Sequence, residues 1–331
     1  MSLYQKSKKP HSRESWIRLS LIPLILVVIL LVVYYQQTTL YSATFQDEQS
    51  ATVIISKNYG TTLLMDTQVS ITAGDTAMDV LHQLTTVGSS YGNAFVTSIN
   101  ELESRYNQGN GEKVDWFYFI NGMLGNIGAH QYQLHPGDIE RWDYHDWSTN
   151  IMTTAIIGDF PEPFLHGFNG NIADTIIAYE EQYEPEAQTI QDFFNDYQID
   201  STIVEISSLS PSQKQTAHIV LIASADHALI QDLVPDARQL GWFIDISSDY
   251  LQTYAEDGLR STNYDSGGCI ISTQNPWNPK GNWHCENVLW ILSGTSSEGI
   301  SQTVHMFTTH PEQIKHAANV IVYQNSVIKV P

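Results

Sequence analysis

Two patterns of hydrophobic and polar residues divide the chain at about residue 160. Before that point, short runs of β-branched and aromatic residues are separated by turn residues, which predicts short strands. One helix is predicted where Met78, Leu81 and their apolar neighbours repeat with helical spacing. Short strands around a single helix indicate a β-rich α+β domain, which we place at residues 51–159. Its expected strands are residues 51–56, 68–71, 95–99, 153–157 and the two segments that contain Trp116 and Ile139.

After Pro161 and Pro163, short apolar runs alternate with amphipathic helices. This alternation is typical of an α/β domain with an open, mostly parallel sheet, which we expect over residues 160–331. The expected helices are residues 184–197, 226–240 and 297–307. The expected strands are residues 175–179, 202–206, 217–223, 242–246, 269–271, 288–292 and 320–323.

The run of residues 19–35 is uncharged and consists mainly of Leu, Ile and Val. A run of that length predicts a transmembrane helix, and the basic residues 1–18 before it predict a cytoplasmic tail. Residues 36–50 are then a tether, and the protein is expected in the cell membrane as a single-pass protein with extracellular C-terminal domains. The alternative is a cleaved signal peptide, which Tyr41 disfavours because a small residue is expected there.

Charge is distributed unevenly along the chain. Five of the fifteen Lys and Arg residues precede the apolar run, so the remainder carries ten of them against thirty-five Asp and Glu residues. Such an acidic remainder excludes nucleic acid as a partner, because neutralising phosphates requires a basic surface.

The two cysteines, Cys269 and Cys285, predict a disulfide if the chain is exported. Closing that loop would stabilise the fold by about 3 kcal/mol in the chain-entropy view. Two buried free thiols, or a reactive thiolate beside His284, are the alternatives. A structural zinc site is not expected, because no second pair of cysteines has the required spacing.

The chain shows no catalytic pattern on which to base an enzyme prediction. Residues 292–299 resemble an ordinary capped turn into a helix rather than a nucleotide-binding loop, and no G-x-S-x-G motif is present. Asp143, His145 and Asp146 do not share one face of a strand, so they favour a solvated strand end over a metal site. We therefore expect no enzyme activity, no catalytic residues and no metal.

Aromatic residues are concentrated on two neighbouring strands and suggest a binding surface for a flat ligand. On the first strand, Trp116 and Tyr118 share one face and Phe117 and Phe119 share the other. Spacing alone does not decide which of these pairs fills the core. The predicted ligand-binding residues are Trp116, Phe117, Tyr118, Phe119, Asn121, Trp142 and Tyr144.

The segment from Val69 to about Trp147 resembles the C-terminal β-domain of transcobalamin and intrinsic factor and its bacterial and archaeal relatives. The residues that carry the resemblance, in order, are 74–81, 95–100, 116–122, 128–132 and 134–138. The resemblance implies a domain that packs over the corrin ring of cobalamin, partly with the segment matched here by Trp116 to Phe119. The helical barrel that forms the rest of the animal site has no counterpart here, and the predicted α/β domain stands in its place.

These observations together predict a membrane-anchored extracellular protein that binds cobalamin or a related corrinoid for capture or uptake. The ligand is expected between the two domains, with Asn121 and Asp143 binding its amide side chains. A membrane transporter is a possible partner. The alternative is a surface adhesion or assembly module whose aromatic residues bind a protein or glycan.

Overall fold

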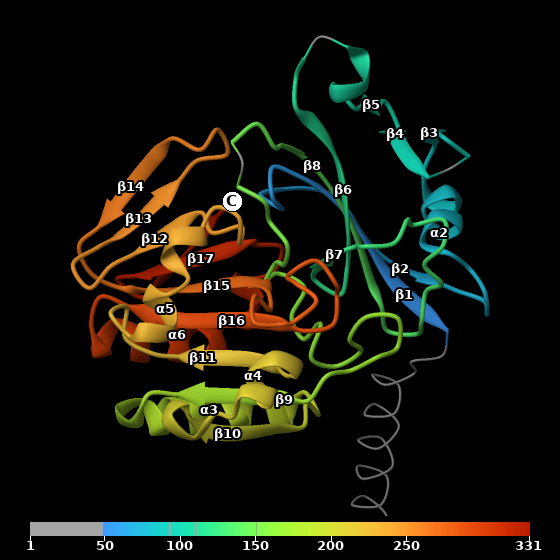
Figure 1. Ribbon diagram of the computed structural model, residues 1–331. Helices are drawn as coiled ribbons and strands as arrows, with labels where there is room; N and C mark the ends of the chain where they lie inside the picture. Colours follow the sequence, from blue (N-terminus) through green and yellow to red (C-terminus); the bar gives the residue numbers. More distant parts are fainter. Residues whose placement is uncertain (1–48, 93, 110, 150) are drawn as a thin grey trace, which may run out of the picture. The chain divides into compact units, whose positions relative to one another are not determined.

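A five-stranded sheet carries the aromatic segment (Figure 1). The computed structural model describes residues 49–331 except 93, 110 and 150. Within this sheet β1 and β8 are parallel, and every other neighbouring pair is antiparallel. The strands, in spatial order, are β2 (Thr62–Ser70), β1 (Ser50–Lys57), β8 (Ile139–Asp146), β6 (Val114–Ile120) and β7 (Met123–Leu124).

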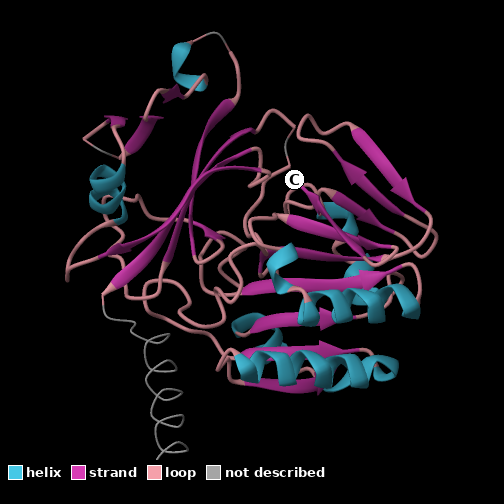
Figure 2. Ribbon diagram, turned by 180° about the vertical axis from the view of Figure 1, so that it is seen from behind, coloured by secondary structure: helices cyan, strands magenta, loops and turns pink. Residues whose placement is uncertain are grey.

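One face of this sheet is covered by helix α2 (Ala77–Leu84) and a small three-stranded sheet (Figures 1 and 2). Thr76 and Asp79 form a capping box at the start of α2, which satisfies amide groups that the first turn leaves without partners. The apolar side of the helix, including Val80 and Leu81, is buried in the core. The small sheet contains β3 (Val87–Ser90), β4 (Phe95–Ile99) and β5 (Leu102–Glu103), and the 3₁₀ turn η1 (Tyr106–Gln108) follows it.

The second half of the described chain forms a seven-stranded mixed sheet, so the expectation of a mostly parallel α/β sheet is wrong. The first four strands in spatial order are parallel, and the remaining neighbours are antiparallel. The order is β10 (Ser201–Glu205), β9 (Thr175–Tyr179), β11 (His218–Ile222), β16 (Val288–Gly294), β15 (Gly268–Gln274), β17 (Asn319–Tyr323) and β18 (Ser326–Val330).

Connections without a helix account for two of the three antiparallel pairs in this sheet, β15 with β16 and β17 with β18. Parallel neighbours require a long crossover, usually a helix, whereas antiparallel neighbours can be joined directly. Residues 275–287 link β15 to β16 without a helix. Gln324 and Asn325 link β17 to β18 with positive φ angles of 49° and 59°, as a two-residue hairpin turn requires.

Helices cover both faces of the seven-stranded sheet (Figures 1 and 2). Helices α3 (Glu184–Asp196) and α6 (Ser297–Thr309) pack on one face. On the other face lie α5 (Ala228–Gln231) and a sheet of β12 (Ile244–Ile246), β13 (Leu251–Tyr254) and β14 (Arg260–Tyr264). The expected helix over 226–240 is interrupted, because Pro235 cannot continue it. The remaining short elements are α4 (Pro211–Thr216), η2 (Glu181–Tyr183), η3 (Ile206–Ser208), η4 (Val234–Asp236) and η5 (Pro311–Gln313).

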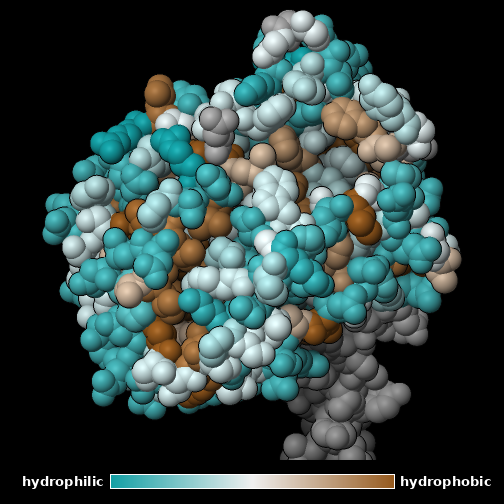
Figure 3. All heavy atoms as spheres, viewed as in Figure 1, coloured by the Kyte–Doolittle hydropathy of each residue, from teal (hydrophilic) through white to brown (hydrophobic). Residues whose placement is uncertain are grey.

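Side-chain hydrogen bonds join β15 of the seven-stranded sheet to β7 of the five-stranded sheet and to Thr154, which lies outside both sheets. The Thr154 and Thr273 hydroxyls lie 2.9 Å apart, and the Gln274 amide donates to the carbonyl oxygen of Leu124 at 3.0 Å. Hydrophilic side chains predominate on the face shown in Figure 3, and hydrophobic ones show between them in smaller groups.

The predicted membrane localisation is corrected by the structure. In the described part of the chain, no helix is both long and apolar enough to span a bilayer. The basic tail, the expected span at 19–35 and the tether as far as residue 48 lie outside the described residues. The expected single-pass protein with extracellular domains, its bilayer contact and its transporter partner therefore have no support in the structure.

The predicted disulfide is also wrong, because Cys269 and Cys285 are free and buried. The backbone N–H of Cys285 donates to the Gln274 side chain at 2.8 Å, so Cys285 lies near the Gln274 end of β15. Cys269 is on β15 itself, five residues before Gln274. That interval is roughly 16 Å of extended chain, far beyond the Cα separation that a disulfide spans. The thiols also belong to different core clusters, one on each face of the sheet.

Candidate functional site

The aromatic residues of β6 and β8 pair across the strands in register. Trp116 lies opposite Tyr144 and Tyr118 lies opposite Trp142, and the ring centroids of each pair are 5.1 Å apart. All four rings therefore share one face of the five-stranded sheet, the face covered by α2. The structure does bring together the aromatic residues that the sequence singled out.

This aromatic face is core rather than an open platform. Trp116 and Tyr118 are 7% and 9% exposed, and Trp142 and Tyr144 are buried as well. The opposite face is also covered: Phe119 is buried, and Phe117 stacks on His145 with 4.1 Å between ring centroids. The aromatic residues of β6 therefore form no broad exposed surface on either face of the strand.

Asn121 is fully buried and acts as a structural residue of the turn between β6 and β7. Its side chain donates to Asp138 Oδ1 and to the carbonyl of Gly167, each at 2.7 Å. It also accepts the Ile139 N–H at 2.7 Å. With these partners inside the protein, Asn121 is not placed to bind an amide of a ligand.

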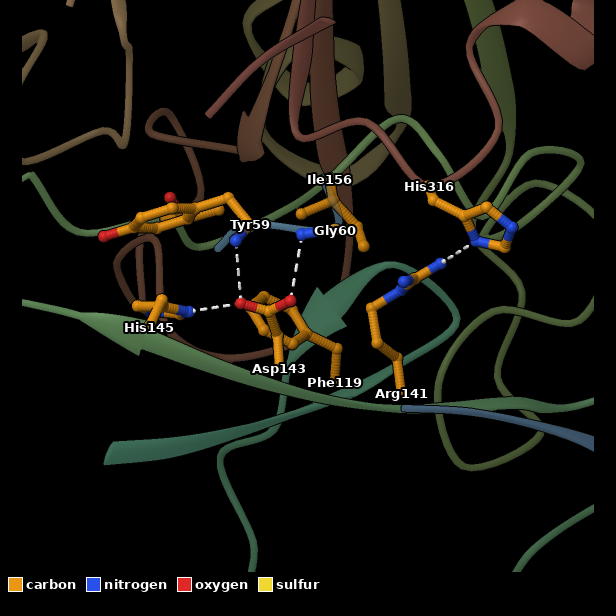
Figure 4. Close-up of a pocket in the computed structure, with 9 residues that line it drawn as sticks. Tyr59, Gly60, Phe119, Arg141, Asp143, His145, Ile156 and His316 are labelled. Atoms are coloured by element: carbon orange, nitrogen blue, oxygen red, sulfur yellow. Dashed lines mark hydrogen bonds and ion pairs between the residues drawn. The ribbon is translucent and has the colours of Figure 1, made fainter. Parts of the chain in front are cut away.

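Asp143 anchors a buried polar cluster on the opposite face of the same sheet (Figure 4). Its carboxylate accepts the Ser56 hydroxyl at 2.6 Å, the backbone N–H groups of Tyr59 and Gly60 at 2.9 Å, and His145 Nδ1 at 2.7 Å. Burial alone would raise the pKa of Asp143, but these hydrogen bonds outweigh it and hold the pKa below its usual value.

Arg141 forms the second half of this cluster. Its guanidinium pairs with the buried carboxylate of Asp159 and contacts His316 Nδ1 at 3.1 Å. Burial, together with the charge of Arg141, lowers the pKa of His316 to about 4. His316 is therefore neutral at physiological pH.

The space inside the cluster is too small for a ligand. The cavity lined by Tyr59, Arg141 and His316 measures about 10 Å³, which is close to the room that one water molecule occupies. The cluster thus seals the side of the five-stranded sheet that faces the rest of the chain. A ligand between the two halves of the protein, as expected from the sequence, would have to displace these buried charges.

A larger groove, of about 440 Å³, opens on the aromatic side of the sheet. We call it the outer groove. This volume is within the range of small-molecule sites. Three of its lining residues, Ile55, Ile99 and Trp116, are buried, whereas Leu64 is 51% exposed. The full lining is Ile55, Lys57, Leu64, Met65, Ile99, Asn100, Glu101, Leu102 and Trp116.

Two hydrogen bonds hold β5 against the aromatic strands beside the groove. The indole N–H of Trp116 donates to the Leu102 carbonyl at 3.1 Å. The Tyr144 hydroxyl donates to the Glu103 carbonyl at 2.8 Å. The polar ends of these two rings therefore position the chain segment that lines the groove, while their apolar parts fill the core.

Glu140 is a buried acid that the sequence did not single out. It lies on the aromatic face of β8, and its Oε1 accepts the indole N–H of Trp142 at 2.6 Å. Burial raises its pKa to about 8, although the Trp142 hydrogen bond opposes the shift. Its Oε2 and the hydroxyl of Tyr118 are buried without a hydrogen-bond partner in the described structure.

The groove-lining residues Leu64 and Met65 were also missed. The expected second strand covered only residues 68–71, but β2 extends from Thr62 to Ser70 and so includes Leu64 and Met65. The run Leu63, Leu64 and Met65 was the available signal, since it ends two residues before the predicted strand. Within the described residues, no group of three or more His, Cys, Asp or Glu side chains is arranged to bind a metal ion.

Comparisons with known proteins concern the β-rich part of the chain. A family model described as a domain of unknown function (DUF4430) matches residues 74–146, within the segment that resembles the transcobalamin β-domain. A solved structure of a candidate metal-binding protein from Ruminococcus gnavus ATCC 29149 is 18% identical, with a TM-score of 0.24, over 30% of this chain and 98% of that one.

Haptocorrin, solved in complex with Cbi, is 17% identical to this chain, with a TM-score of 0.25. The similar region covers 30% of this chain and 26% of haptocorrin, so this chain matches about a quarter of that protein. No curated protein matches.

Proposed function

We propose that this chain is a binding protein, without catalytic activity, for an organic ligand that places an apolar part in the outer groove. The observation that carries the proposal is the outer groove of about 440 Å³, in which buried apolar residues and the edge of Trp116 meet exposed Leu64. Apolar lining with few polar groups is typical of small-molecule sites.

We further propose that the ligand is a corrinoid. The support is the resemblance of residues 69–147 to the β-domain of transcobalamin and intrinsic factor, because the outer groove includes Trp116 from the segment matched to the corrin-facing strand. A groove of this volume would enclose one edge of the macrocycle and leave the remainder in solvent. The ligand would thus lie on the aromatic side of the sheet rather than between the two halves of the protein.

Calorimetric titration of the full chain with cyanocobalamin tests this proposal. Leu64→Gln removes apolar surface from the groove, and Leu259→Gln is the matched control, because Leu259 is an exposed leucine outside the groove lining. We expect saturable binding that Leu64→Gln weakens about tenfold, since the burial of one aliphatic side chain contributes roughly 1.5 kcal/mol. Leu259→Gln should leave the affinity unchanged. No saturable heat with the unaltered chain would contradict the corrinoid proposal.

A second candidate function, pairing with a second copy of this chain, is favoured by the exposed edge strand β2. In the described structure β2 pairs only with β1, and Leu63 is 45% exposed. Open edges accept an additional strand from a partner. Leu63 is outside the groove lining, so Leu63→Lys should reduce self-association, measured by sedimentation, without affecting ligand binding. A chain that sediments as a monomer at every concentration would contradict pairing between two copies.

A further inference from the structure

Lys57 is an unpaired cation in the lining of the outer groove. Of the ten Lys and Arg residues in the described part of the chain, Lys57 alone has a side chain that makes no hydrogen bond, ion pair or cation–π contact. The others have the following partners: Arg105 with Glu112, Lys113 with Trp147, Arg141 with Asp159, Lys214 with Trp277, Arg238 and Arg260 with Tyr254, Lys280 with Glu286, Lys315 with Asp66, and Lys329 with the Lys315 carbonyl.

The surroundings of Lys57 leave its ammonium group available to a ligand. The residue is half-buried at the end of β1, among mostly apolar lining residues. Partial burial removes water from an ammonium group, and this cost is offset only when an acceptor takes the place of water. Glu101, the acid in the groove lining, is exposed and is not paired with Lys57. Glu256 attracts Lys57 at longer range, beyond the distance of an ion pair.

We propose that the ligand of the outer groove carries an anionic group, a carboxylate, phosphate or sulfonate, that pairs with Lys57 while the apolar body of the ligand contacts Leu64, Met65 and Trp116. This inference rests on the proposed function in one respect, namely that the outer groove is the ligand site. It adds the charge of the ligand, which the apolar lining does not specify. In a chain with a large excess of acidic residues, an unpaired lysine in an apolar groove selects for a ligand of the opposite sign.

A pair of fluorescent probes tests the charge without assuming a corrinoid. 8-Anilinonaphthalene-1-sulfonate and N-phenyl-1-naphthylamine share one aromatic framework, and only the first carries a sulfonate. Both are titrated into the full chain and into Lys57→Gln, Lys57→Arg and Lys113→Gln. Lys113→Gln is the control of equal charge change, because Lys113 is exposed and lies outside the groove lining.

We expect the unaltered chain to prefer the sulfonate probe, and Lys57→Gln to weaken that probe about fivefold, the effect of a partly exposed charged hydrogen bond. The affinity for the neutral probe should not change, Lys57→Arg should keep the preference, and Lys113→Gln should behave as the unaltered chain. The inference is overturned if Lys57→Gln leaves the ratio of the two probe affinities unchanged, whether neither affinity falls or both fall equally.

These outcomes separate the inference from the corrinoid proposal. If cyanocobalamin binds but Lys57→Gln leaves the probe ratio unchanged, the charge inference fails alone. If the Lys57-dependent preference is found but cyanocobalamin does not bind, the inference stands and the corrinoid assignment fails alone.

Discussion

The indole N–H of Trp116 donates a 3.1 Å hydrogen bond to the carbonyl of Leu102, and both residues line the outer groove. One residue belongs to the central aromatic strand and the other to the short strand β5. The bond therefore fixes the position of a groove-lining segment relative to the sheet that supports it.

Trp116→Phe should reduce both stability and ligand affinity. Phenylalanine keeps the aromatic packing but leaves the Leu102 carbonyl without this donor, so we expect a loss of about 1 kcal/mol in unfolding free energy and a several-fold weaker ligand affinity. Urea unfolding and calorimetry measure the two effects. Trp147→Phe is the control, because the Trp147 indole nitrogen is buried without a partner in the described structure. Equal effects of the two substitutions would count against the role of the Leu102 bond.

Glu140→Gln should flatten the dependence of stability on pH. The folded-state pKa of Glu140 is about 8, against an ordinary value of 4.5, so the folded chain holds this proton more tightly than the unfolded chain. Protonated Glu140 therefore contributes to the free energy of unfolding. This contribution is fully present below about pH 4.5 and is lost as the pH rises through about 8. The loss should be on the order of a few kcal/mol, and glutamine, which does not ionise, should abolish it. Parallel urea-unfolding profiles for the two proteins across this range would refute the assignment.

Arg141→Met should be among the most destabilising single substitutions in the protein. It leaves Asp159 buried without its cation, and breaking a buried pair in this way costs about 3–5 kcal/mol. Replacing both residues, as Arg141→Met with Asp159→Leu, should recover part of the loss because no unpaired charge remains. Chemical denaturation of the two variants gives the comparison. A double variant less stable than the single one would show that the account of this pair is mistaken.

The two cysteines should be unreactive in the folded protein and reactive after unfolding. Burial raises the pKa of both Cys269 and Cys285 to about 12, so almost no thiolate is present at neutral pH. A thiol reagent such as dithionitrobenzoate should therefore titrate both cysteines only in denaturant. A reductant should leave the melting temperature unchanged. Absence of free thiols in the denatured chain would instead indicate a disulfide.

Local sequence pattern predicted the elements well where hydrophobic periodicity was strong. The strand at 175–179, the helix beginning at Glu184 and the helix beginning at Ser297 lie where they were expected. In the two helices the apolar residues face one core with helical spacing, whereas the strand is a short apolar run buried on both faces, so each pattern determines its element. Strands with weak alternation, such as β14, whose residues are mostly exposed, had no such signal.

The arrangement of the elements was less predictable, because it depends on connections and on partners far away in sequence. The antiparallel half of the second sheet depends on the connection at 275–287 and on a hairpin turn at Gln324. The burial of both faces of β6 depends on α2 on one side and the Asp143 cluster on the other. Residue spacing predicts which side chains share a face of a strand, but it does not predict which other elements cover that face.

Hydrogen–deuterium exchange of the full chain, with and without saturating cyanocobalamin, tests whether the ligand occupies the outer groove. We expect slower exchange at Leu64, Met65 and residues 99–102, which line the groove. Protection at residues 153–159 and 314–318, around the buried Arg141 cluster, with none at the groove would contradict this expectation.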